Sequence, residues 1–432
     1  MIRGFGDILK IPELKKRVFF TLGILAVYRI GAAIPTPGID GIALKAFFET
    51  QKGTLFGFLD LFSGGALNRL SIFALGIMPY INASIIMSLL QTAVPYLERL
   101  AKEGESGRKK ITQITRYFTL VLAAVQSFGL TFWMQTIKAP NGTPIVRDPG
   151  FGFQFLAILT LTTGTVLIMW LGEQITEKGV GNGISLIIFA GIVDRLPTAL
   201  KNAVVLVRSN QMQLFTLLLL TMVIVFITAC VVLVEQAQRK IPVQYAKRVI
   251  GRKMYGGQST YLPLKVDQSG VIAVIFSVAI MIFPATIAQF FPNLKVATLI
   301  KDYLDPSKLP YNIAFGGLII FFCYFYTAIT FNPNDLADNM KKWGGFIPGI
   351  RPGAQTSEYI DRVLTRITFG GAVFVMLIAV FPNFVPALMG FGGTSVLIIV
   401  GVALDTVGQI ESHLIMRHYE GFMKKGRIKG RR

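Results

Sequence analysis

Charged residues are scarce in this chain of 432 residues, of which only 15% are Asp, Glu, Lys or Arg. Soluble domains carry about 25%. Histidine and cysteine occur only twice each. His413 and His418 have no cysteine or carboxylate set beside them that would complete a metal site. Cys230 and Cys323 lie inside long apolar runs and indicate no disulfide framework. The composition therefore argues against a soluble enzyme and a disulfide-rich secreted domain.

Motifs for catalysis are missing as well. The chain has no G-x-x-x-x-G-K-[ST] loop, so no P-loop nucleotide site is predicted. Gly179, Gly181 and Gly183 alternate just before a predicted helix, which favours a turn and cap over phosphate binding. We find no pairing of a nucleophile with a base. The sequence therefore predicts that the protein is not an enzyme and binds no metal or cofactor. Any energy needed to drive its activity must come from a partner.

Apolar and basic residues are what the chain has in abundance. Hydrophobic residues make up 53% of it, and 43 Lys and Arg against 23 Asp and Glu give a net charge of +20. In a soluble protein this charge would suggest nucleic-acid binding. In a mostly apolar chain it predicts a membrane protein whose positive charge is collected on one side.

Long apolar runs predict the membrane spans, since a helix needs about 20 apolar residues to cross a bilayer. Two weaker candidates are residues 184–193, which are few and end at Asp194 and Arg195, and residues 396–410, which contain Asp405. The eight clear candidates are residues 18–34, 72–94, 117–134, 151–171, 214–234, 271–291, 313–331 and 367–388.

The placement of positive charge supports ten spans. With ten spans, 31 of the 43 Lys and Arg lie on the side of the two termini. The positive-inside rule then places both termini in the cytoplasm. Without the span at 184–193, the loop 235–269 with its seven basic residues would face outside.

The predicted fold is an all-α polytopic membrane protein with ten transmembrane helices. Ten spans can divide into two inverted five-helix halves, an arrangement in which the working path lies between the halves. We expect a cytoplasmic N-terminal segment 1–17, a first half 18–206 and a second half 207–411. The second half contains the cytoplasmic loops 235–269 and 332–366, and a basic cytoplasmic tail follows at 412–432.

A short apolar stretch between the first two spans fits neither a span nor an ordinary loop. Residues 55–63 are too few to cross a bilayer, and Gly64 and Gly65 then free the backbone to turn. The stretch could lie on the membrane interface, form a plain loop or re-enter the protein. Irregular backbone at membrane depth occurs only where it is buried in protein or lines a cavity.

Several ordered motifs carry a resemblance to a known family. They are residues 62–67 (FSGGAL) leading into 72–81 (IFALGIMPYI), 170–177 (WLGEQITE) followed by 181–185 (GNGIS), 331–333 (FNP), 348–353 (PGIRPG) and 392–395 (GGTS). Together, in this order and at these spacings, they resemble the SecY family over nearly the whole chain. The resemblance implies the central channel subunit of the bacterial Sec protein translocase, in the cytoplasmic membrane, and a re-entrant plug helix in the fold.

A protein-conducting channel must pass an unfolded chain and exclude ions, and a ring of apolar side chains does both because it dewets when empty. Ile77 and Ile81 lie one helical turn apart, and Ile184 and Ile188 repeat this spacing. The resemblance adds Ile275 and Ile398, which gives a pore ring of six. The alternative is that these isoleucines pack or face lipid.

The same resemblance assigns residues 55–70 as a plug outside the ring, with a static re-entrant loop as the alternative. Asp60 and Arg69 weaken its burial. The plug residues we single out are Leu55, Phe58, Asp60, Leu61, Phe62, Gly64 and Gly65.

The resemblance also implies a lateral gate and a docking surface. Asn82, Gln126 and Ser277 could bond across a closed gate that releases hydrophobic segments into lipid, or within their own helices. Cationic loop tips suit ribosomal RNA phosphates or acidic grooves of a motor. These basic residues could instead serve topology alone. The docking candidates are Lys247, Arg248, Arg252, Lys253 and Arg351.

The partners implied are SecE and a SecG-like membrane subunit, the SecA motor ATPase, the ribosome, and unfolded preproteins with their signal sequences. Arg29 and Asp405 are the ionisable residues most clearly inside apolar runs, and one hypothesis pairs them. The rival class is a secondary transporter for a small solute. It would need a compact polar site at the membrane midplane, and the sequence shows none.

Overall fold

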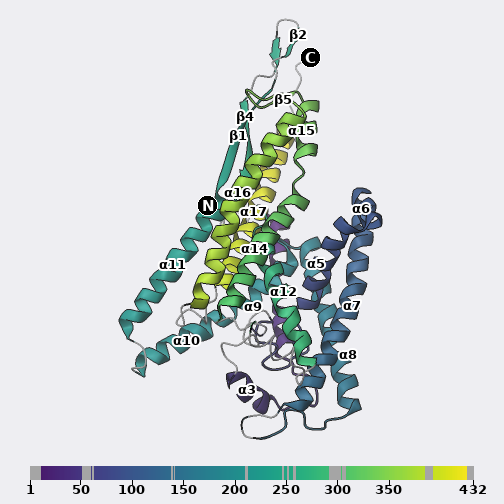
Figure 1. Ribbon diagram of the computed structural model, residues 1–432, viewed down its shortest axis with the longest axis vertical. Coiled ribbons are helices and arrows are strands. Elements are labelled where there is room, and N and C mark those ends of the chain that lie inside the picture. Colours follow the sequence, from purple (N-terminus) through teal and green to yellow (C-terminus); the bar gives the residue numbers. More distant parts are fainter. Residues whose placement is uncertain are drawn as a thin grey trace. The chain divides into compact units, whose positions relative to one another are not determined.

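A computed structural model gives the fold of the chain (Figure 1). It describes residues 11–50, 60, 63–137, 140, 142–209, 213–245, 248–250, 253–255, 259–290, 303, 308–384 and 393–425.

Helices account for most of these residues, as a bilayer requires of a chain that must bond its own backbone groups. Ten helices lie where spans were predicted: α2 (Pro12–Ala33), α5 (Met78–Ala93), α7 (Glu105–Thr136), α8 (Phe151–Lys178), α9 (Gly183–Val193), α11 (Leu214–Gln236), α12 (Val271–Phe290), α14 (Leu309–Thr330), α16 (Ala354–Val380) and α17 (Gly393–Lys425). The other described helices are α3 (Gly41–Thr50), α6 (Pro95–Lys102), α10 (Arg195–Arg208), α15 (Pro333–Lys342) and the 3₁₀ turn η1 (Phe381–Phe384).

Each of the ten predicted spans overlaps one of these ten helices. Among the described residues, seven helical stretches are long and apolar enough to cross a membrane. The weak candidate at 184–193 is α9, and it gains length because α10 follows directly, giving a stretch over Gly183–Arg208. The sequence did not predict α10, since Asp194 and Arg195 end the apolar run.

The chain divides into two compact units. One contains Met1–Gln213, Ala279–Lys308 and Val402–Arg432, and the other contains Leu214–Val278 and Leu309–Gly401. In the first unit α8 packs against α2, α7 and α9, and α5 packs against α7. In the second unit α14 and α15 pack on α16.

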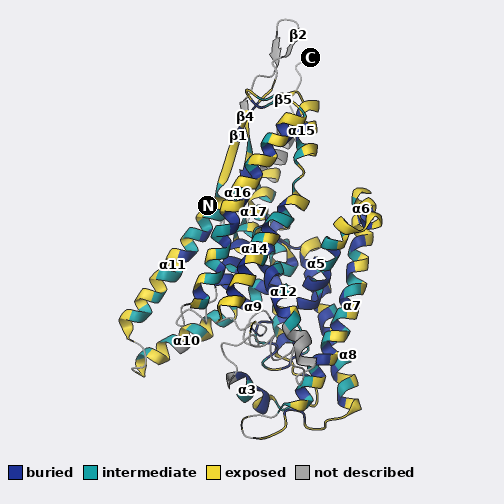
Figure 2. Ribbon diagram, viewed as in Figure 1, coloured by how far each residue is buried: buried dark blue, intermediate teal, exposed yellow. Residues whose placement is uncertain are grey.

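Helix burial differs widely within the chain (Figure 2). Only 6% of the most apolar window of α11 is buried, against 50% for α17. Phe215, Met222 and Phe226 on α11 are each more than two-thirds exposed. A helix that is apolar all round and has little protein cover is suited to a lipid surrounding.

A small sheet lies in the two loops that were predicted without strands. Strand β1 (Gln238–Tyr245) pairs antiparallel with β4 (Ser259–Lys265), in the register Ile241 to Leu262, and with β5 (Gly345–Phe346). A separate hairpin joins β2 (Arg248–Ile250) to β3 (Lys253–Tyr255). Ile241, Val243 and Leu264 pack with Met340 of α15 and Ile360 of α16 in one buried cluster. The all-α prediction therefore holds for the membrane part, and the sheet adds a folded connection between loops 235–269 and 332–366.

Candidate functional site

The first pair of pore-ring candidates lies at the start of α5. The Ile81 amide donates to the Ile77 carbonyl at 3.1 Å, and both side chains are buried. The turns before α5 are fixed on the first unit, since the rings of Phe73 and Tyr28 stack at 5.8 Å. A Cβ on Gly164 would lie 2.0 Å from the Ile72 carbonyl oxygen. This close backbone approach to α8 sets the position of the pair.

The second pair lies in the first turns of α9. The Asn182 side chain caps that helix by accepting from the amides of Ile184 and Ser185 at 3.1 and 3.4 Å. The alternating glycines thus serve a turn and cap, as predicted. Ile188 is 1% exposed and Ile184 is half-buried. A Cβ on Gly172 would lie 3.3 Å from Cγ1 of Ile184, so part of that side chain packs on α8.

The third pair belongs to the second unit. Ile275 on α12 and Ile398 on α17 are both buried. A Cβ on Gly401 would lie 2.0 Å from Cγ2 of Val271, so the two helices approach closely there. Ile275 follows Val271 by four residues and Ile398 precedes Gly401 by three, which puts the isoleucines on the approaching faces. Five of the six candidates are buried, and their convergence on one constriction stays a prediction.

The plug candidates are only partly within the described residues. Leu55, Phe58, Leu61 and Phe62 lie outside them, whereas Asp60, Gly64 and Gly65 are described. The two glycines have φ of 64° and 80°, values that favour glycine.

The sequence led us to expect that the charge of Asp60 weakens the burial of the plug. In the structure Asp60 is buried together with partners for its charge. Asp60 is 5% exposed and has partners for both carboxylate oxygens. Arg195 forms an ion pair with Oδ2, and the Asn68 amide donates to Oδ1 at 2.8 Å. Arg69, by contrast, is exposed.

Arg29 has a partner other than the one hypothesised. Its guanidinium forms an ion pair with Asp194, between α9 and α10, and donates to the Gly64 carbonyl at 3.4 Å. Sequence reasoning missed Asp194 and Arg195 as functional candidates. The signal was present, because these two charges interrupt an apolar run.

The lateral-gate candidates differ from one another. Ser277 is fully buried, and its hydroxyl donates to the Ala273 carbonyl at 2.8 Å, within its own helix. Asn82 is buried and Gln126 half-buried, and neither side chain hydrogen-bonds to another residue in the described part of the chain. A role across a gate stays a prediction for all three.

Among the docking candidates, Arg351 is the one whose surroundings are clear. It is exposed, and its carbonyl accepts from the Thr356 hydroxyl at 2.9 Å. Gly349 and Gly353 on either side have φ of 81° and 108°, so the tip is a defined turn. Arg248 and Lys253 contribute backbone to β2 and β3, while Lys247 and Arg252 lie outside the described residues.

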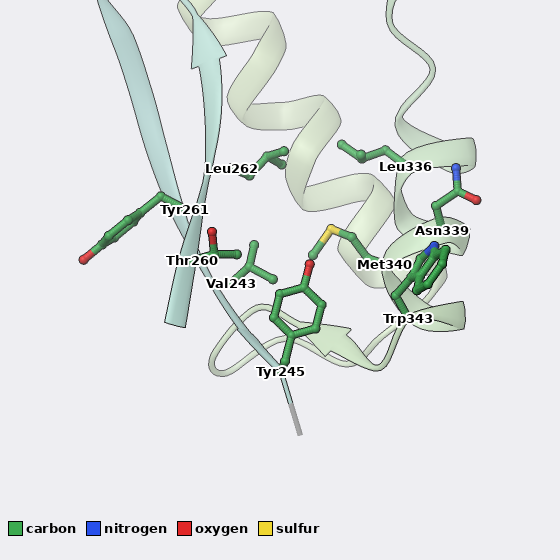
Figure 3. A pocket seen from close by; sticks show the side chains of 9 residues that line it. All are labelled: Val243, Tyr245, Thr260, Tyr261, Leu262, Leu336, Asn339, Met340 and Trp343. Atoms are coloured by element: carbon green, nitrogen blue, oxygen red, sulfur yellow. The ribbon is translucent and has the colours of Figure 1, made fainter. Parts of the chain in front are cut away.

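A pocket of about 250 Å³ opens beside the sheet formed by β1, β4 and β5. In Figure 3, Leu336 and Met340 of α15 face Val243 and Leu262 of the strands. The remaining lining residues are Tyr245, Thr260, Tyr261, Asn339 and Trp343. The two loops thus share a largely apolar hollow with aromatic residues among its lining.

Comparisons with known proteins agree with this geometry. A profile of the SecY family matches residues 71–407. The protein translocase subunit SecY of Escherichia coli K12 is 49% identical over 425 residues, covering 97% of this chain and 96% of that one.

Two solved structures share the fold. One is a SecY structure in which the plug domain stabilises the closed state of the translocation channel and maintains a membrane seal. It has a TM-score of 0.62 at 18% identity, and the match covers 96% of this chain and 95% of that one. Sec61 in the canine ribosome-channel complex from the endoplasmic reticulum has a TM-score of 0.60 at 18% identity, with the same coverage. The profile and the near full-length identity show that the chain belongs to the SecY family.

Proposed function

We propose that this chain is the protein-conducting channel subunit of a Sec-type translocase in the bacterial cytoplasmic membrane. It passes unfolded secretory proteins across the membrane and releases transmembrane segments sideways into lipid. Membership of the SecY family carries this proposal, since a relative named as a protein translocase subunit is 49% identical over 97% of the chain. The chain is a channel subunit and not an enzyme, so a partner supplies the drive.

The six isoleucines form the seal of the proposed pore. An apolar constriction excludes water and ions when empty and holds a passing peptide only weakly. The burial of Ile77, Ile81, Ile188, Ile275 and Ile398 supports this role over one of facing lipid. Residues 55–70 act as the plug, and Asn82, Gln126 and Ser277 act in the gate.

The orientation follows from charge. Of the 43 Lys and Arg, 31 lie on the side of the termini, which therefore face the cytoplasm. Loops 235–269 and 332–366 then project toward cytoplasmic partners. Sec61, a structural relative, is known from a complex with the ribosome. We propose that the Arg351 tip and the basic residues of the first loop contact ribosomal RNA or the SecA motor, with SecE and a SecG-like subunit as membrane partners.

Reconstitution tests the channel itself. The chain is incorporated into vesicles with SecE, a SecG-like subunit and SecA, and protection of a preprotein from added protease is followed. We expect protection that requires ATP and SecA. Saturable uptake of a small solute without any preprotein protection would favour a transporter.

A substitution tests the seal. Ile81→Ser introduces a hydroxyl into the proposed constriction, so the idle channel should wet and conduct ions more readily. Ile30→Ser is the matched control, because Ile30 is 65% exposed on α2. Equal ion leak in the two variants, both of them monodisperse, would contradict the ring.

A charge reversal tests docking. Arg351→Glu should weaken ribosome or SecA binding and flatten its dependence on salt, as loss of a phosphate or carboxylate contact does. Lys342→Glu is the control, since Lys342 is also exposed but lies at the end of α15 and outside the tip. Identical losses in the two variants would leave net charge as the cause and contradict a role for the tip.

A further inference from the structure

Asp60 and Gly64 contact the joint between α9 and α10, where Asp194 and Arg195 interrupt the apolar sequence. Asp60 is buried, and its ion pair with Arg195 links positions 135 residues apart in the chain. The Asp60 carbonyl also accepts from the Gly65 amide at 2.9 Å. Asp60 therefore closes the local turn through its carbonyl and attaches it to the joint through its carboxylate.

A second arginine holds the same turn from α2. Arg29 pairs with Asp194 and donates to the Gly64 carbonyl at 3.4 Å. A Cβ on Gly64 would lie 2.8 Å from the Cα of Gly191, so the turn lies directly on α9. We name Asp60, Arg195, Arg29 and Asp194 the arginine clasp.

The other end of the segment is attached by a different kind of bond. The Thr36 amide donates to the Leu70 carbonyl at 2.8 Å, and the Ile72 amide donates to the Ile34 carbonyl at 3.0 Å. Leu70 is fully buried and has φ of 37°, the one positive value at a non-glycine residue in the described part of the chain. Such a conformation persists only where surrounding structure holds it. Residues 70–72 are thus fixed by backbone hydrogen bonds, whereas Asp60 and Gly64 are fixed by side-chain contacts.

We propose that the arginine clasp holds the plug closed, and that opening breaks the Asp60–Arg195 pair while residues 70–72 stay attached. This inference rests on the proposed plug function of residues 55–70. A buried carboxylate without its cation is strongly unfavourable, so the pair opposes displacement of Asp60 and residues 63–65 from the joint. When water and a polypeptide fill the pore, the separated charges are hydrated again. The pair thus stabilises the closed state selectively.

Ion leak through the idle channel measures how firmly the arginine clasp holds the plug closed. The full complex is placed in planar bilayers, and the single variants Asp60→Asn and Arg195→Gln are compared with the double variant. Contacting residues couple energetically, and we expect each single change to raise the leak about tenfold, which corresponds to ~1.4 kcal/mol. The double variant should leak no more than either single one. Arg195→Lys keeps the charge and should leak less than Arg195→Gln.

The control is Glu98→Gln, which removes the anion of an exposed ion pair with Lys102. Wild-type leak in Asp60→Asn, or leaks that multiply in the double variant, would overturn the clasp. Deletion of residues 55–65 separates this failure from that of the proposed function. If that deletion leaks and the wild type translocates while Asp60→Asn stays sealed, only the clasp is wrong. If the wild type does not translocate and the deletion stays sealed, the channel and plug assignment is wrong.

Discussion

Two stretches of irregular backbone interrupt the apolar helices of the first unit, and they are held in opposite ways. Residues 179–183, between α8 and α9, contain no ionisable side chain and are held by close packing and hydrogen bonds. The Gly183 amide donates to the Thr176 hydroxyl at 3.0 Å, the Gly181 amide donates to Gln409 at 2.9 Å, and the Arg17 guanidinium donates to the Gly179 carbonyl at 3.4 Å. Asp60 and residues 63–65 are held by the ion pairs of the arginine clasp.

The difference indicates which stretch can move. Gly183 packs against the Gly172 backbone, so the turn before α9 cannot move without separating α8 from α9, since protein interiors are close-packed. An ion pair can separate once both charges reach water. The turn before α9 is therefore a fixed joint, and the turn formed by Asp60 and residues 63–65 is a detachable one. Glycine-to-alanine substitutions in the two stretches should separate these roles.

Gly183→Ala should have the largest effect. Its Cβ would lie 1.9 Å from the Gly172 carbonyl oxygen, and neither backbone can move without separating α8 from α9. Overpacking of this kind costs ~1–3 kcal/mol or more. We expect loss of monodisperse protein, measured by size-exclusion chromatography after heating. Gly23→Ala is the control, since nothing lies within 4 Å of its added Cβ. Equal thermal stability of the two variants would remove the distinction between the stretches.

Gly64→Ala should leave the helices intact and loosen the plug. The added Cβ would lie 2.8 Å from the Gly191 Cα, and φ of 64° disfavours alanine by ~1 kcal/mol. Asp60 and residues 63–65 can relieve both strains by leaving the joint. We expect a raised idle ion leak with thermal stability close to that of the wild type. A large loss of stability with no change in leak would mean that this turn, too, is a fixed joint.

The membrane part was predictable because the bilayer restricts the chain to continuous apolar helices. Each predicted span overlaps a helix, and the turn-and-cap role of the glycines before α9 was visible from the sequence, since Gly179 caps the end of α8 and Gly181 has a φ of 89°. The sheet was not predictable. In β1 only Ile241 and Val243 alternate with exposed neighbours, and its partner β5 has two residues about 100 positions away.

The ion-pair partners of charged residues were the other feature that could not be predicted from the sequence. The sequence identifies Arg29 as an intramembrane cation, and it offered Asp405 as a partner although the estimated depths of the two residues differ by several Å. Ion pairs require atoms within 4 Å, whereas depths inferred from apolar runs are uncertain by more than that. The contact with Asp194 depends on how α2 packs near α9, which hydropathy does not encode.

Asn182→Ala should have a moderate effect on the fixed joint. It removes the acceptor for the amides of Ile184 and Ser185, and losing such a cap costs ~1 kcal/mol. The packing of Gly183 on Gly172 remains, so the loss of thermal stability should be smaller than for Gly183→Ala. Asn182→Asp keeps the acceptor and should restore most of the stability. Failure of aspartate to do so would mean that the amide group has a role other than capping.

The smallest effect should come from Asp40, which lies before α3 and outside the membrane spans. The amides of Ala43 and Ile42 donate to its carboxylate and lower its pKa. An acid whose pKa is lower in the folded state stabilises above its unfolded pKa of about 3.9 and loses this contribution as pH falls through the folded value.

Hydrogen exchange at the amides of residues 42 and 43 should therefore be as slow at pH 5 as at pH 7, after correction for the intrinsic rate. Asp40→Ala should make this exchange faster at both pH values without changing the midpoint of thermal unfolding, because Asp40 is partly exposed while Leu44 stays fully buried in the core. Faster exchange at pH 5 in the wild type would show that the carboxylate is already protonated and that the cap does not lower its pKa. A shift of the unfolding midpoint in Asp40→Ala would show that this partly exposed cap is coupled to the packed core.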